Sequence, residues 1–211
     1  MTRVRAFIQA RMSSHRLPGK VLAPIANRPL IDHTIDRVAD AMDRDAIVVL
    51  TSVCPSDDPL AVYVASRGVH VYRGNLDDVF ARFRNCLNDH PCDWFVRLSA
   101  DSPDLPTDLI RSMIQRIDDD VDLITNLYPR SWSKGHSVEV VRTSKFMQIE
   151  PDELEDDDRE HVTPFMYRNP SKFRIHNVPC PNPAARTTSH AVDTLEDFYR
   201  MNRMLDSTNI E

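Results

Sequence analysis

Short apolar runs alternate with helical patterns over the first 126 residues, and this rhythm restricts the fold more than any other feature of the chain. The apolar runs cover residues 4–10, 46–51, 69–73, 94–98 and 121–125. The helical patterns cover residues 29–42, 59–66, 77–87 and 106–117, with Pro29 expected as a first helical residue. Because strands that are apolar throughout are buried on both faces, the pattern predicts a three-layer α/β/α, Rossmann-like fold with a mixed, mainly parallel sheet.

The rhythm breaks after residue 126. Strands are predicted at residues 138–141, 173–178 and 190–192, and an acidic stretch leads into one helix over residues 153–168. A proline-rich turn is expected at 179–183 and a closing helix over 194–205. Since the chain contains no linker, internal repeat or low-complexity segment, we expect a single domain over residues 1–211.

The composition is that of a globular protein, with 41% hydrophobic and 27% charged residues. The chain has no run of about 18 apolar residues and no signal-peptide pattern, so we expect neither a membrane span nor export. Its four cysteines lack metal-ligand spacing, which favours free thiols in a reducing cytoplasm. A formal net charge of −6 argues against a general nucleic-acid partner.

Positive charge is nevertheless concentrated at the amino terminus, where six cationic side chains precede the first acidic residue, Asp32. Three of them, Arg11, Arg16 and Lys20, lie in the stretch I-Q-A-R-M-S-S-H-R-L-P-G-K. A cationic loop after an apolar strand suits a polyphosphate, although a basic surface loop is the plain alternative. Val21 follows Lys20, so the loop is not a Walker motif, and four glycines in the whole chain cannot supply G-x-G-x-x-G.

Five blocks resemble one family in the same order along the chain: I-Q-A-R-M-S-S-H-R-L-P-G-K-V-L, V-Y-R-G-N-L-D-D-V-F-A-R-F, V-R-L-S-A-D-S-P, R-E-H-V-T-P-F-M-Y and A-V-D-T-L-E-D-F. They resemble the cytidylyltransferases of the spore coat polysaccharide type, relatives of the synthetases that join CMP to 3-deoxy-octulosonate or to sialic acids. The resemblance implies a nucleotide-diphospho-sugar transferase (GT-A-like) fold and a homodimer. It also implies a nucleotide-binding half over residues 1–126 and an acceptor-binding and closing half over residues 127–211.

The resemblance also implies roles for single residues. Arg11 and Lys20 would hold the triphosphate of CTP and stabilise the leaving pyrophosphate, while Asp101 and Asp193 would bind Mg²⁺. Asp193 has an alternative role as a helix N-cap. The further nucleotide-binding candidates are Ala10, Ser13, Arg16, Arg73 and Gly74, with Ser14 as a possible phosphate donor.

The acceptor site is expected in the second half of the chain, at Glu139, Glu160 and His161. Here the sequence departs from the family, because Gly135-His136-Ser137 stands where the family often has G-L-D. The loss of that carboxylate leaves the acceptor open. His136 and Ser137 would suit a phosphonate or phosphate group as well as a sugar acid.

The sequence therefore predicts a Mg²⁺-dependent transfer of CMP from CTP to a sugar acid or related anionic acceptor, with release of pyrophosphate. Two other classes remain: a non-catalytic nucleotide-binding relative and a glycosyltransferase of similar fold. Against the glycosyltransferase, no D-x-D motif follows a strand.

Overall fold

The computed structural model describes residues 2–182 and 188–208. Seven strands form one sheet in the order β5-β4-β1-β6-β8-β7-β9. β8 pairs antiparallel with both of its neighbours, and all other neighbouring strands pair in parallel, so the expectation of a mixed, mainly parallel sheet is confirmed. The strands are β1 (Val4–Gln9), β4 (Ile47–Ser52), β5 (His70–Gly74), β6 (Trp94–Ser99), β7 (Leu123–Thr125), β8 (Glu139–Arg142) and β9 (Ile175–Asn177).

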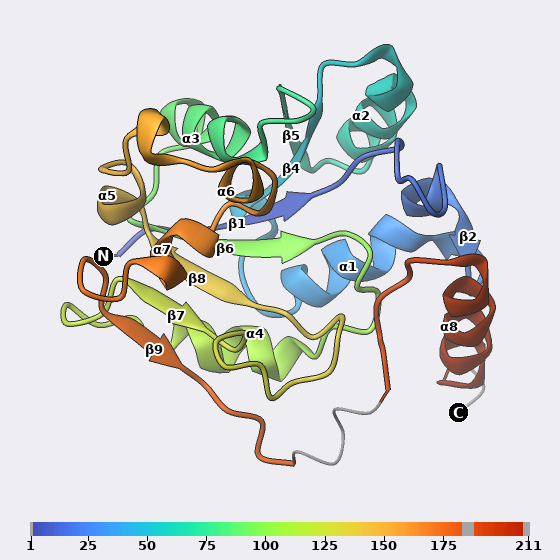
Figure 1. The fold of residues 1–211 in the computed structure, drawn as a ribbon. Coiled ribbons are helices and arrows are strands. Elements are labelled where there is room, and N and C mark those ends of the chain that lie inside the picture. Colours follow the sequence, from blue (N-terminus) through green and yellow to red (C-terminus); the bar gives the residue numbers. More distant parts are fainter. Residues whose placement is uncertain (1, 183–187, 209–211) are drawn as a thin grey trace.

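Helices cover both faces of this sheet (Figure 1). Side chains alternate along a strand, so Ala6 and Ile8 of β1 point to one face and Phe7 points to the other, and all three are fully buried. The first face packs on α1 (Leu30–Ala39), α2 (Asp58–Ser66) and α4 (Thr107–Ile114). The second packs on α3 (Val79–Asp89), α5 (Thr143–Phe146) and α7 (Pro164–Arg168), and α6 (Asp156–His161) packs beside α3 and α7. The three-layer architecture is thereby confirmed.

A third, smaller apolar cluster lies beside the sheet. It joins α8 (Leu195–Thr208) to the hairpin of β2 (Pro24–Ile25) and β3 (Arg28–Pro29), as the right side of Figure 1 shows. Four single turns of 3-10 helix complete the secondary structure of the described residues: η1 (Lys20–Leu22), η2 (Arg44–Ala46), η3 (Pro55–Asp57) and η4 (Pro151–Glu153).

Three expectations about local structure are wrong. Pro29 ends β3 and forms the N-cap of α1 rather than its first helical residue. The helix expected over 153–168 is two helices, because Val162 takes a φ of 73° after α6 and Pro164 begins α7. Residues 190–192 are not a strand, since the N–H and the carbonyl of Val192 bond to Asp101 and Lys20 instead of to a neighbouring strand.

The proline-rich turn expected at 179–183 lies in the described residues only up to position 182.

Both sequence halves contribute to the one sheet, because β8 from the second half inserts between β6 and β7 from the first. The division into a nucleotide half and an acceptor half remains a prediction. None of the helices in the described part of the chain is long and apolar enough to cross a membrane.

Candidate active site

A cavity of about 380 Å³ opens at the carboxyl edge of the sheet. β1 and β6 are parallel neighbours, paired from Val4↔Trp94 to Gln9↔Ser99, so their carboxyl ends meet at this edge. The other walls come from the loop after β1, the start of α3, the end of α6 and the segment before α8. The predicted site residues that line the cavity are Ala10, Arg11, Arg16, Lys20, Asp101, Glu160, His161 and Asp193, together with Ser14.

The loop after β1 closes on itself and directs Lys20 into the cavity. Gly19 has a φ of 76°, a conformation that favours glycine, and its N–H donates to the carbonyl of Met12 at 2.8 Å. η1 begins at Lys20, which is only 7% exposed. An ammonium group so deeply buried requires partners of opposite charge.

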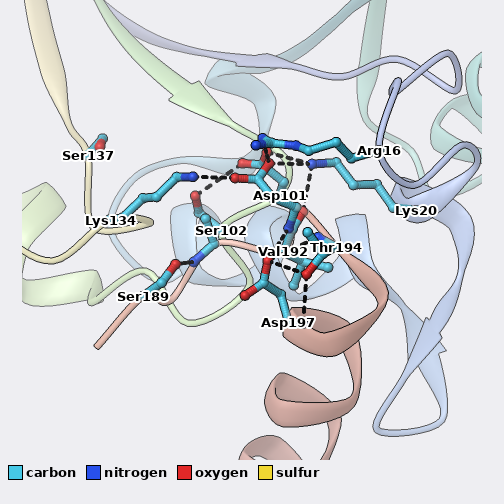
Figure 2. A network of polar contacts seen from close by, with 12 residues as sticks. Arg16, Lys20, Asp101, Ser102, Lys134, Ser137, Ser189, Val192, Thr194 and Asp197 are labelled. Carbon is cyan, nitrogen blue, oxygen red and sulfur yellow. Dashed lines mark hydrogen bonds and ion pairs between the residues drawn. The ribbon is translucent and has the colours of Figure 1, made fainter. Parts of the chain in front are cut away.

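Asp101 and Asp193 are those partners, and Figure 2 shows Lys20 beside Asp101. The Nζ of Lys20 lies 2.8 Å from Oδ2 of Asp101 and 3.3 Å from Oδ1 of Asp193, and it donates to the carbonyl of Val192 at 2.6 Å. The N–H of Val192 donates in turn to the carbonyl of Asp101 at 2.9 Å. The two predicted metal ligands therefore meet at one point, although Asp101 comes from the turn after β6 and Asp193 from the segment before α8.

Two further cations surround Asp193. Arg16 Nη2 lies 2.8 Å from its Oδ1, and Lys134 Nζ lies 2.5 Å from its Oδ2. Burial would raise the pKa of Asp193, but the hydrogen bond from Lys134 and the charge of Lys20 outweigh it and hold the pKa below its ordinary value. Asp193 is therefore ionised at neutral pH and counterbalances a concentration of positive charge.

The alternative role of Asp193 as a helix cap is taken by other residues. Thr194 and Asp197 form a reciprocal cap at the start of α8: the Thr194 N–H donates to Oδ2 of Asp197 at 3.0 Å, and the Asp197 N–H donates to Oγ1 of Thr194 at 3.2 Å. The N–H of Asp193 also donates to Asp197 at 3.1 Å. The backbone around Asp193 is thus fixed while its carboxylate faces the cavity.

The donor set at this point fits a hard divalent cation. Two carboxylates and the carbonyl of Val192 all contact the same ammonium nitrogen, which marks the position where a positive charge is most stabilised. Mg²⁺ prefers oxygen ligands, usually one or two carboxylates completed by water and substrate phosphates. Asp101 and Asp193 are the residues that would hold it.

Arg82 of α3 lines the cavity and is a residue that the sequence analysis missed. It is 2% exposed, its Nη2 donates to the carbonyl of Leu76 at 3.1 Å, and its Nε is buried without a hydrogen-bond partner. Burial, with a smaller contribution from the charge of Arg11, lowers its pKa to about 10, so it remains charged at pH 7. The sequence feature that could have identified Arg82 is its position as a single arginine on the apolar face of the pattern V-F-A-R-F.

Arg11, Glu160 and His161 also line the cavity. Arg11 Nη2 lies 3.7 Å from Oε1 of Glu160, and His161 Nε2 lies 3.7 Å from Oδ1 of Asp157. Both pairs are loose and partly exposed, so these side chains can turn toward a ligand at small cost.

Several predicted residues do not line the cavity. Arg73 donates to the carbonyls of Ser52 and Cys54 and pairs with Asp58, so its guanidinium ties the end of β4 to α2 instead of facing the cavity. Gly74 makes room for Arg82, because a Cβ at position 74 would lie only 2.9 Å from Cγ of Arg82.

Ser13 and Glu139 are also outside the cavity wall. The hydroxyl of Ser13 is buried without a hydrogen-bond partner. Glu139 is 1% exposed, and its carboxylate is occupied by Arg97, Thr163 and Tyr167. An acceptor could reach Glu139 only by displacing these bonds.

A mainly parallel sheet with a cationic cavity and paired aspartates at its carboxyl edge fits a nucleotidyltransferase. The cytidylyltransferase family model matches residues 6–208, and the chain belongs to that family.

Known relatives agree with this assignment. The chain is 33% identical over 207 residues to the spore coat polysaccharide biosynthesis protein SpsF of Bacillus subtilis, covering 94% of this chain and 84% of that protein. A cytidylyltransferase structure from Leptospira borgpetersenii superposes with a TM-score of 0.90 at 26% identity, over 98% of this chain and 86% of that one. A CMP:2-keto-3-deoxy-manno-octonic acid synthetase solved in complex with CTP shares the fold, with a TM-score of 0.72 at 16% identity over 98% of this chain and 100% of that one.

Proposed function

We propose that this enzyme transfers CMP from CTP to an anionic acceptor of the sugar-acid class and releases pyrophosphate, with Mg²⁺ held by Asp101 and Asp193. The observation that carries the proposal is the buried cluster of Lys20, Asp101 and Asp193 at the base of the cavity. The relatives' names supply the choice of CTP and of a sugar acid, because both occur in the names of proteins that share the fold or the family.

Bond formation in such a reaction joins an acceptor oxygen to the α-phosphorus while the pyrophosphate oxygen leaves. The protein has little covalent chemistry to perform, since alignment and neutralisation of charge dominate phosphoryl-type transfer. Mg²⁺, when bound, neutralises phosphate charge and polarises the α-phosphoryl group.

The chain's own cations then bind and orient the triphosphate. Arg11 and Arg16 can each grip two phosphate oxygens, whereas Lys20 offers a point charge from a buried position. Arg82 adds a buried charge with an unsatisfied N–H, which a phosphate or ribose oxygen would satisfy. Charge developing on pyrophosphate is stabilised by these groups.

We place the acceptor beside Glu160 and His161. Lys134 adds a positive charge next to Asp193 in this part of the molecule, and both Nη atoms of Arg130 donate to Ser137 Oγ at 3.3 Å. Ser137 lies apart from the network around Asp101 in Figure 2, and we assign it to the acceptor side rather than to the metal. These cations favour an acceptor with a carboxylate, and a phosphonate or phosphate acceptor fits the same charge.

The test is pyrophosphate release from CTP and Mg²⁺ with a panel of acceptors: 3-deoxy-octulosonate, a sialic acid and a phosphonate. Release with at least one acceptor, lost in Asp101→Asn, supports the proposal, and UTP and ATP in place of CTP measure base selectivity. If CTP raises the melting temperature but no acceptor yields pyrophosphate, the acceptor class is wrong. If CTP does not bind at all, the proposed function fails.

Action in the cytoplasm and assembly as a homodimer remain predictions from the sequence. Sedimentation velocity of the purified protein tests the second: a mass near twice the chain's 24.2 kDa supports a dimer.

A further inference from the structure

A second cluster of ionisable side chains, Asp104, His136 and His190, lies outside the cavity wall. Nδ1 of His190 lies 2.9 Å from Oδ2 of Asp104, and Nε2 of His136 lies 3.8 Å from the same oxygen. The two imidazole rings stack with centroids 4.1 Å apart. One possible ligand atom from each of the three side chains lies within 4.8 Å of the other two.

The three residues come from separate segments that the fold presses together. Asp104 follows β6, His136 precedes β8 and His190 precedes α8. The His190 N–H donates to the carbonyl of Lys134 at 2.6 Å. Gly135, with a φ of 94°, approaches so closely that a Cβ would lie 2.4 Å from the N of Ala191. The backbone is therefore fixed around the cluster before any ligand is considered.

The cluster leaves one polar atom unsatisfied. Nε2 of His136 is buried and has no hydrogen-bond partner. A buried nitrogen without a hydrogen-bond partner is unfavourable, so a ligand that satisfies it would be stabilised. The side chains are only 13% (His136), 18% (His190) and 26% (Asp104) exposed, and the nitrogen is directed at a carboxylate that stands too far away for a hydrogen bond.

Asp104 offers one carboxylate oxygen to both imidazoles. Its Oδ2 is the atom that His190 Nδ1 and His136 Nε2 approach. Its second oxygen, Oδ1, lies 3.7 Å from Nη2 of Arg37 on α1. Oδ2 is therefore the carboxylate atom available to a shared ligand.

We propose that Asp104, His136 and His190 bind one divalent transition-metal ion of the Zn²⁺ class. Two imidazole nitrogens and one carboxylate oxygen are ligands that Zn²⁺ takes, whereas Mg²⁺ and Ca²⁺ select oxygen. Tetrahedral bonds of about 2.0–2.1 Å put ligand atoms about 3.3 Å apart. The 2.9 Å and 3.8 Å separations from Asp104 Oδ2 lie on either side of that value, and all three ligand atoms lie within 4.8 Å of one another, so small side-chain movements would bring them to bonding distance of one ion.

The three side chains would leave a fourth position for water, and the ion's role would be to hold together the segments that carry them. Asp104 lies three residues after Asp101, His136 lies two residues after Lys134, and His190 lies three residues before Asp193. An ion shared by these segments holds the carboxylates of the active site in place without touching the substrate. The inference depends on this cluster alone and not on the proposed function.

The experiment is titration of metal-free, tag-free protein with Zn²⁺ by calorimetry, in excess Mg²⁺ so that oxygen-only sites are filled. We expect one Zn²⁺ per chain, and visible absorption from Co²⁺ bound in its place. The variants His136→Gln and His190→Gln should each weaken Zn²⁺ binding by at least tenfold, because even the loss of a second-shell partner costs about 10–100-fold. His176→Gln is the matched control, since His176 is exposed on β9, and it should bind Zn²⁺ as the parent does.

If a variant fails to fold, Zn²⁺ and Co²⁺ binding by the parent protein still tests the proposal. No Zn²⁺ or Co²⁺ binding by the parent in excess Mg²⁺ would overturn the proposal and leave the cluster as a hydrogen-bonded His-Asp pair. Unchanged Zn²⁺ affinity in both folded variants would also overturn it, because the ion would then lie elsewhere. Neither result depends on CTP turnover, so a failure here is distinct from a failure of the proposed function.

Discussion

Replacement of Lys20 by methionine should destabilise the metal-free protein and make its stability depend on Mg²⁺. The substitution keeps most of the buried side-chain volume but removes the ammonium group that contacts Asp101, Asp193 and the carbonyl of Val192. The two carboxylates, 23% and 12% exposed, would then share a confined space with less positive charge around them.

The magnitude follows from the contacts that are lost and those that remain. Removing one partner of a buried ion pair costs about 3–5 kcal/mol. Arg16 and Lys134 still neutralise Asp193, and Asp101 is partly exposed, so the lower end, about 3 kcal/mol, is expected. For a chain of this size each kcal/mol moves the melting temperature by about 2–4 °C, which gives a fall of about 6–12 °C in EDTA.

Mg²⁺ should then stabilise the variant more than the parent, because in the variant no ammonium group competes for the two carboxylates. Pyrophosphate release should nevertheless fall by about 10²–10³-fold, the usual effect of removing one charge-stabilising group. Thermal unfolding in EDTA and in a Mg²⁺ series measures the first effect, and a coupled pyrophosphate assay measures the second. Lys172→Met is the control, since Lys172 is exposed, pairs with Glu153 and lies over the ring of Phe165, away from the cavity wall. Equal melting temperatures for Lys20→Met and the parent in EDTA, or equal Mg²⁺ responses, would refute the reasoning.

Three further predictions follow from other contacts. Burial would raise the pKa of Asp122, but hydrogen bonds from Arg174 outweigh it and hold the pKa below its ordinary value of 3.8. The ionised carboxylate therefore stabilises the protein above that pH, and this stabilisation is lost as the pH falls below it. In Asp122→Asn the free energy of unfolding, measured with denaturant, should fall less steeply below about pH 4 than in the parent, and an equally steep fall would contradict this. Gly74→Val should displace Arg82, which lowers the melting temperature because the site is fully packed, and should raise the KM for CTP in the protein that remains folded; an unchanged KM would remove Arg82 from the site. Glu139→Gln leaves Arg97 without its counterion and should lower the free energy of unfolding by about 3 kcal/mol. A variant that keeps its full stability but has a raised KM for the acceptor would instead support acceptor binding by Glu139.

Local patterns carried most of the fold prediction. Continuous apolar runs such as I-V-V-L-T-S must be buried on both faces, so the layers and the mainly parallel sheet could be inferred from periodicity. The same reasoning failed at residues 190–192, which look like a strand. Their backbone groups bond to Lys20 and Asp101, and no local pattern reports such partners.

The candidate site, too, could be predicted from the sequence only in part. The cationic loop could be recognised because Arg11, Arg16 and Lys20 lie within ten consecutive residues. Arg82 was missed because helical periodicity predicts that its position belongs to the core. Lys134 was missed because its partner, Asp193, is distant in the sequence.

The sequence by itself determined the family, the strand and helix segments and the concentration of cations before the first acidic residue. Tertiary structure alone decided that β8 inserts between β6 and β7, that Asp101 and Asp193 share one ammonium group, and that two histidines surround Asp104. The reason is physical: Lys20 contacts its two carboxylates across sequence separations of 81 and 173 residues. Periodicity reports only neighbours along the chain, whereas such contacts form only when the packed layers bring distant segments together.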